Sequence, residues 1–145
     1  METDKRLSIY LNDHLAGASA GAELARRLAA AGHAPRELAA EIEEDRATLL
    51  ELMAALAVPV RRYKTWLGWL GEKATRLKQG GAVLELEAMR LGVEGKAAGW
   101  RTLRTRADHD TRLDKDRIDA LLTRANRQID QLEKLRLAAA EKTLV

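Results

Sequence analysis

Apolar residues recur at intervals of three and four along nearly the whole chain, and a few glycines and prolines interrupt this pattern. Such intervals place apolar side chains on one face of an α-helix, whereas a half-buried strand requires strict alternation. The interruptions are Gly32, Pro35, Pro59, the Gly80–Gly81 pair and an acid-rich turn from Asp108 to Asp114. Since no stretch alternates as a strand would, the sequence predicts an all-α fold.

The interruptions divide the chain into five predicted helical segments. The first three run from about Asp4 to Ala31, from Pro35 to Pro59 and from Val60 to Lys78. The fourth covers about Ala82 to Ala107, and the fifth follows the acidic turn and includes Ile118 to Leu132. Aspartates that precede a helix usually cap its N-terminus. We therefore favour capping over cation binding for the acidic turn.

The lengths of the connections predict how these helices are arranged. The turns after the first and fourth segments are short, so each of those helices should lie antiparallel to the next one. The third segment, if helical, would span about 28 Å, which is nearly the length of a bundle. We therefore predict one domain over residues 1–145, an up-down-down-up four-helix bundle with an additional helical crossover between its second and third helices. An orthogonal helical bundle is the alternative fold.

Polar residues interrupt the apolar stripes near the middle of the first, second and fourth segments, at His14, Asp45 and Glu94. The helical rise places these residues and Gln128 in one broad middle layer. Burial of an ionisable group is unfavourable unless the group is paired or bound. The favoured interpretation is a buried polar network whose members satisfy one another. The other interpretation is a degraded site for a metal or a small ligand.

Five glycines also fall at helical spacing: Gly17, Gly21, Gly92, Gly95 and Gly99. Each costs up to about 1 kcal/mol relative to alanine inside a helix. One explanation is a close approach of two helices, with Trp100 or another large side chain filling the space beside them. The other is that small residues leave room for a ligand beside the polar layer. A cavity lined by Gly21, Gly95 and Asp45 would favour the second explanation.

Two segments, Ile9–Gly17 (IYLNDHLAG) and Glu43–Leu50 (EEDRATLL), resemble stretches of small bacterial proteins of the ferritin-like superfamily. The bundles of that superfamily also have one long connection between the second and third helices, so the architectural resemblance covers nearly the whole chain. In its di-iron members two helices each supply a Glu and two supply Glu-x-x-His. Here Glu41-x-x-Glu44 stands where Glu-x-x-His is expected, and residues 115–131 contain no Glu or His. The resemblance implies a ferritin-like bundle without a competent di-iron site.

These patterns indicate a non-enzymatic binding or structural protein that needs no cofactor. The chain has no Cys, no phosphate-binding Gly-rich loop and no nucleophile elbow. The alternative is a metal-dependent oxidase or iron-handling protein that binds iron or another divalent metal. Its ligands would come from one histidine and five carboxylates: His14, Glu41, Glu44, Asp45, Glu87 and Glu94.

The third predicted segment is the candidate interaction surface. Six Lys or Arg residues and a single Glu lie between Val60 and Lys78, together with two tryptophans. Such a basic face fits an anionic partner, and Trp69 fits a homodimer contact. A solvated face whose basic side chains cover apolar surface is the favoured interpretation. The residues concerned are Arg62, Trp66, Trp69, Lys73 and Arg76.

Charge and hydropathy bound the remaining possibilities. The net charge is +3 and the charges are interspersed, which argues against nucleic acid as a partner. The longest apolar run, Leu52–Val60, is too short to span a bilayer, and the charged N-terminus does not resemble a signal peptide. We therefore expect a cytoplasmic protein.

Overall fold

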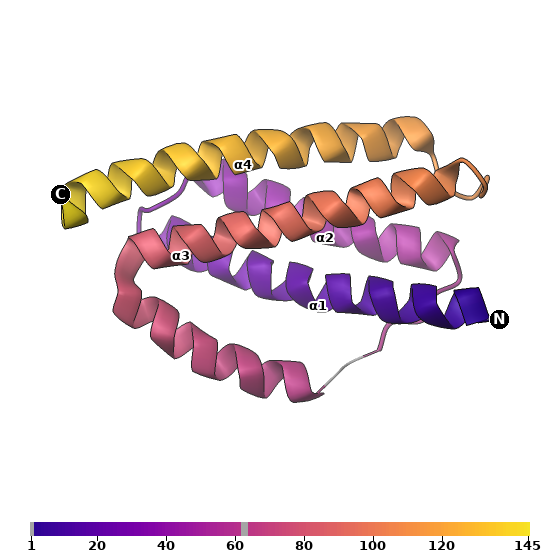
Figure 1. The fold of residues 1–145 in the computed structure, drawn as a ribbon, viewed down its shortest axis with the longest axis horizontal. Helices are drawn as coiled ribbons and strands as arrows, with labels where there is room; N and C mark the ends of the chain where they lie inside the picture. Colours follow the sequence, from indigo (N-terminus) through magenta and orange to yellow (C-terminus); the bar gives the residue numbers. More distant parts are fainter. Residues whose placement is uncertain (1, 62–63) are drawn as a thin grey trace.

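Four helices account for most of the chain in the computed structural model (Figure 1). It describes residues 2–61 and 64–145, and the side chains of all of these except residues 64–78. The helices are α1 (Glu2–Ala30), α2 (Arg36–Ala55), α3 (Lys64–Ala107) and α4 (Lys115–Leu144). No strand occurs in the described ranges. The predicted all-α fold is therefore confirmed.

The helix ends fall close to the predicted interruptions. Gly32, just after α1, has a φ of 78°, a conformation that glycine adopts without steric cost. Pro35 precedes α2 as its N-cap residue. The Asp114 carboxylate accepts hydrogen bonds from the backbone N–H groups of Asp116 and Arg117 and so caps α4. The capping expected of the acidic turn is confirmed at Asp114.

The third and fourth predicted segments are joined in the single helix α3, which breaks at Gly81. This residue has a φ of 73° and a ψ of −168°, values outside the helical region. The chain turns sharply there in Figure 1, so residues 64–80 point away from the direction of residues 82–107. The break lies at the glycine pair that the sequence singled out, because a positive φ is strained for other residues.

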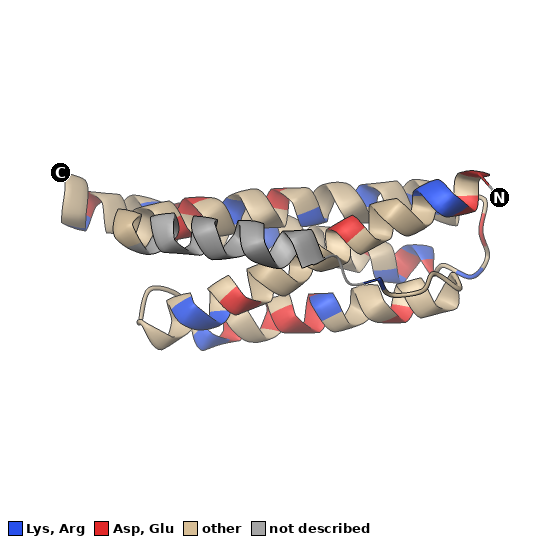
Figure 2. Cartoon of the chain, turned by 90° about the horizontal axis from the view of Figure 1, so that it is seen from below, with Lys and Arg blue, Asp and Glu red and all other residues tan. Residues whose placement is uncertain are grey.

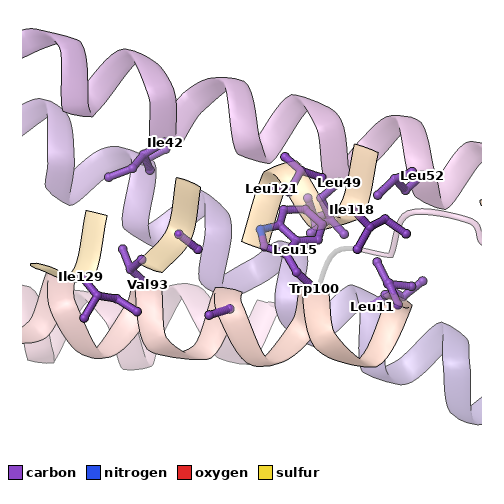
Figure 3. Packing of buried hydrophobic residues seen from close by; sticks show 14 of the residues in the cluster. Leu11, Leu15, Ile42, Leu49, Leu52, Val93, Trp100, Ile118, Leu121 and Ile129 are labelled. Atoms are coloured by element: carbon purple, nitrogen blue, oxygen red, sulfur yellow. The ribbon is translucent and has the colours of Figure 1, made fainter. Parts of the chain in front are cut away.

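The four helices pack together around one apolar core. Helix α1 packs against α2 and α3, and α4 packs against α3. Figure 1 shows α1 antiparallel to α2, and residues 82–107 of α3 antiparallel to α4. The largest fully buried apolar side chains come from all four helices: Leu11, Leu28, Met53, Leu86, Leu103, Ile118 and Leu132. Figure 3 shows how part of this core interlocks between the helices.

Charged residues of both signs are mixed along the helices (Figure 2). This agrees with the interspersed charge of the sequence. Over the described residues, no helix combines the length and the apolar character needed to cross a membrane.

Candidate functional site

A buried ionic network occupies the middle of the bundle, between α2, α3 and α4. Asp45 of α2 is only 2% exposed. Its Oδ1 accepts hydrogen bonds from Arg124 Nε at 3.0 Å and Nη2 at 2.5 Å, and its Oδ2 accepts one from Lys96 Nζ at 2.6 Å. Lys96 also donates to Gln128 Oε1 at 2.6 Å. Asp45 therefore faces two cations, which is the pairing that a buried carboxylate requires.

The network continues along the interface between α2 and α4. Arg127 Nη2 donates to Glu41 Oε2 at 2.5 Å, and Gln128 Nε2 donates to Glu41 Oε1 at 3.2 Å. Gln128 Nε2 also lies 3.3 Å from Asp45 Oδ2. Long polar side chains thus join α2 to α4, from Gln128 in the interior to Arg127 at the surface.

Lys96 depends on its carboxylate partner. Burial lowers the pKa of the Lys96 ammonium, while the charge of Asp45 and its hydrogen bond act in the opposite direction. Because both effects act on the same group, removing Asp45 would lower the pKa of Lys96 further.

A cavity of about 290 Å³ lies beside the network, between α1, α2 and α3. Its wall is largely apolar and includes Leu11, Ile42, Met89, Val93 and Trp100. Its polar lining residues are Asp13, His14, Asp45, Arg46 and Lys96. All five glycines discussed above also line it, including Gly21 and Gly95. The structure therefore favours the explanation in which small residues leave room beside the polar layer.

The glycines do not all serve the same purpose. A Cβ atom added at Gly17 or Gly95 would meet no atom within 4 Å. A Cβ at Gly99 would lie 3.0 Å from Nδ1 of His14. Gly99 therefore allows the imidazole ring to lie against the backbone of α3, as the close-approach explanation requires. Gly17 and Gly95 border open space.

His14 lies at the edge of the cavity rather than in the ionic network. Its ring is partly buried and lies with its centroid 4.5 Å from that of Tyr10. Burial lowers the pKa of His14, and the nearby Asp13 carboxylate partly opposes this shift. No hydrogen bond between His14 and Asp45 is found in the described part of the chain. The imidazole is therefore a mainly neutral group on the cavity wall at pH 7.

The prediction that Glu94 belongs to the buried layer is wrong, because its side chain is exposed. The interior face of α3 runs through Val93, Ala97 and Trp100. Lys96 lies three residues from Val93 and so reaches the interior, whereas Glu94 is rotated by about 100° from Val93. Lys96 was missed because a lysine in a helix is usually exposed. Its spacing from Val93 was the available signal.

The residues proposed as metal ligands in the alternative function are not brought together. They were His14, Glu41, Glu44, Asp45, Glu87 and Glu94. The three on α2 face the arginine and lysine side chains of the network, and Glu87 accepts a hydrogen bond from Arg136 at 3.4 Å. Over the described residues, no group of three or more His, Asp or Glu side chains is placed to hold a metal ion.

Asn12 is a buried polar residue that the sequence patterns did not bring out. Its Nδ2 donates to the backbone oxygens of Ser8 at 2.9 Å and Pro59 at 3.0 Å, and its Oδ1 accepts from the backbone N–H of Arg61 at 2.7 Å. Asn12 therefore attaches the segment after α2 to α1. Its spacing of three residues from Leu15, which lies on the buried face of α1, was the available sequence signal.

The predicted interaction surface cannot be compared with the structure. Arg62 and the side chains of Trp66, Trp69, Lys73 and Arg76 lie outside the described residues. The anionic partner and the homodimer contact therefore stay predictions.

Comparison with known proteins gives no family for this chain. No protein-family model, curated protein or solved structure matches it. The functional argument accordingly depends on the geometry of the cavity and of the ionic network.

Proposed function

We propose that this protein is a non-enzymatic binding protein, which holds a small and largely apolar ligand in the cavity between α1, α2 and α3. The observation that carries the proposal is the cavity of about 290 Å³ beside the ionic network. Small-molecule pockets typically measure roughly 300–1,000 Å³ and combine an apolar wall with a few polar groups. The cavity has this composition, and its volume of about 290 Å³ is just below this range.

The hydrogen bonds of Asp45 and Lys96 argue against a catalytic role for these two groups. Asp45 and Lys96 are bonded to each other, and each has a further partner in Arg124 or Gln128. A general base or a nucleophile must instead have a lone pair directed at the substrate. The network is therefore best understood as a rigid wall that keeps the cavity open.

We also propose that the bundle has the ferritin-like up-down-down-up arrangement, with residues 64–80 as the crossover. The antiparallel pairs α1–α2 and α3–α4 and the break at Gly81 support it. Di-iron members of that superfamily build their metal site from side chains on facing helices. In this chain an ionic network and an apolar cavity take up the corresponding interior.

Titration with the neutral fluorophore N-phenyl-1-naphthylamine tests the proposed binding. Its emission rises on transfer from water to an apolar site, so we expect a saturable increase with one site per chain. Gly95→Leu should abolish this signal by placing a large side chain in the open space beside Gly95. Glu94→Leu adds the same side chain one residue earlier, at a position that does not line the cavity.

Equal titrations of the Gly95→Leu and Glu94→Leu variants would contradict the proposal, as would the absence of saturable binding to the unmodified protein. Circular dichroism of both variants tests whether they remain folded.

A further inference from the structure

His14 is a polar group on the cavity wall that has no hydrogen-bond partner among the described residues. Its ring contacts that of Tyr10, and the carboxylate of Asp13 acts on it through its charge. Over the same residues, the side-chain nitrogen and oxygen atoms that are both fully buried and unpartnered belong to Arg27 and Trp100. The ring nitrogens of His14 are not among them, so they retain accessible surface. A molecule in the cavity that His14 lines can therefore form a hydrogen bond with the imidazole.

His14 lies toward one end of the cavity, and the other end is apolar. At the first end, a Cβ added at Gly99 would lie 3.0 Å from Nδ1 of His14. At the second end, a Cβ added at Gly21 would lie 3.3 Å from Cε of Met89. The seven residues of α1 from His14 to Gly21 correspond to a helical rise of about 10 Å. The cavity therefore suits a molecule of about this length that is polar at one end only.

The charges that line the cavity have partners or are solvated. Asp45 is paired with Lys96 and Arg124. Arg46 lies 3.6 Å from a carboxylate oxygen of Glu43. Asp13 is exposed, so water solvates its carboxylate. A charged ligand would have to break a buried pair to be neutralised in the interior, which is unfavourable, whereas a neutral ligand leaves the pairs intact.

From these observations we infer that the cavity binds neutral molecules with an apolar body and one terminal hydroxyl group, which forms a hydrogen bond with a ring nitrogen of His14. A neutral imidazole has one N–H donor and one acceptor nitrogen, and a hydroxyl group can pair with either. This inference rests on the proposed function and adds the chemical class of the ligand. Alkylphenols are simple members of this class.

Two probes of nearly identical shape test the inference, 4-butylphenol and 4-butyltoluene, which differ by OH in place of CH₃. Each is measured by its displacement of N-phenyl-1-naphthylamine at pH 8. Because the methyl group is more hydrophobic than the hydroxyl group, the informative quantity is the ratio of the two Kd values in each variant. The net value of one hydrogen bond predicts that His14→Phe shifts this ratio against the phenol by roughly 2-fold to 12-fold. His33→Phe, which changes an exposed histidine outside the cavity, should leave the ratio unchanged.

Nuclear magnetic resonance of the imidazole nitrogens gives a second measurement. The chain has 3 histidines, so substitution assigns the resonances of His14. These resonances should shift with the phenol and much less with 4-butyltoluene. His14→Leu gives a second variant without the imidazole, for the case that Phe does not fit beside Gly99. Binding of N-phenyl-1-naphthylamine to each variant tests whether the cavity is retained.

An unchanged ratio in His14→Phe and His14→Leu, with unmoved imidazole resonances, would overturn the inference and leave the proposed function standing. Loss of the phenol's advantage in Asp13→Asn but not in the His14 variants would assign the hydroxyl group to that carboxylate, and would also overturn it. Tighter binding of 4-butylbenzoate or 4-butylbenzylamine than of the phenol would do the same. Failure of N-phenyl-1-naphthylamine to bind to the unmodified protein would instead remove the proposed function itself.

Discussion

The interface between α2 and α4 differs from the interface between α1 and α3 in how the interior space is used. Charged side chains bridge α2 and α4, where Asp45 pairs with Arg124 in the interior and Glu41 pairs with the largely exposed Arg127. Between α1 and α3 five glycines are among the facing residues, and a cavity of about 290 Å³ remains. Paired polar groups bridge one interface, and the other is left partly empty.

This difference separates the groups that stabilise the fold from the cavity that we propose binds a ligand. A paired network loses much of its value when one member is removed, because the remaining charges stay buried. Glycines that border open space lower the stability of the helix, and no packing contact offsets this loss. Substitutions should therefore be harmful in the network and, at selected glycines, favourable to stability.

The largest effect should come from Asp45→Ala, which leaves Lys96 and Arg124 facing each other without a carboxylate. We expect the free energy of unfolding to fall by about 3–5 kcal/mol, as for other broken buried ion pairs. Urea denaturation measures it. The control is Glu44→Ala, which removes an acid 68% exposed and 3.5 Å from Arg124 and should cost less than about 1 kcal/mol. A similar small loss in both variants would mean that the network is hydrated.

A smaller loss is expected from Lys96→Met, because Asp45 keeps its bonds to Arg124 and Gln128. Hydrogen bonds to charged groups are worth about 1.5–3 kcal/mol, which sets the expected decrease. In a double-mutant cycle, Asp45→Ala combined with Lys96→Met should cost less than the sum of the single changes. Additive losses would show that the two side chains do not act as a pair.

The sequence predicted the helices well, because spacing and punctuation are local properties. Gly32, Gly81 and Asp114 end or begin helices through their own backbone or side-chain chemistry. The buried position of Asp45 could also be predicted, since it lies on the same stripe as Ile42 and Leu49.

The partners of Asp45 could not be predicted in the same way. Which cation reaches it depends on the rotation of α3 and α4, and a lysine can extend far from its own backbone. Lys96 was therefore overlooked, and Glu94 was placed wrongly on the inside. The cavity depends on the packing of α1, α2 and α3. The sequence indicated only that glycines at helical spacing would leave room for it.

The two kinds of glycine give the sharpest contrast within the α1–α3 interface. Gly95→Ala should raise the free energy of unfolding by about 0.5–1 kcal/mol, because the new methyl group meets no atom within 4 Å. In Gly99→Ala the methyl group would lie 3.0 Å from His14 Nδ1. Overpacking then outweighs the helix gain, with a net loss of about 1 kcal/mol. Thermal denaturation distinguishes the two, and equal gains would show that the imidazole moves away freely.

The smallest effect should be the pH dependence of stability that His14 causes at the α1–α3 interface. Burial holds its folded-state pKa below the ordinary value of 6.5, so on acidification the unfolded chain takes up the proton first. The contribution of neutral His14 is thus complete above pH 6.5 and is lost as the pH falls from there toward the folded pKa. The free energy of unfolding should change with pH by less than the ~1.4 kcal/mol per pH unit that uptake of one whole proton would give, because the ring is partly exposed. Denaturation at pH 7.5 and at pH 5.5 should show that the free energy of unfolding falls more in the unmodified protein than in His14→Asn. Equal decreases in the two proteins would mean that the imidazole lies in a water-like environment.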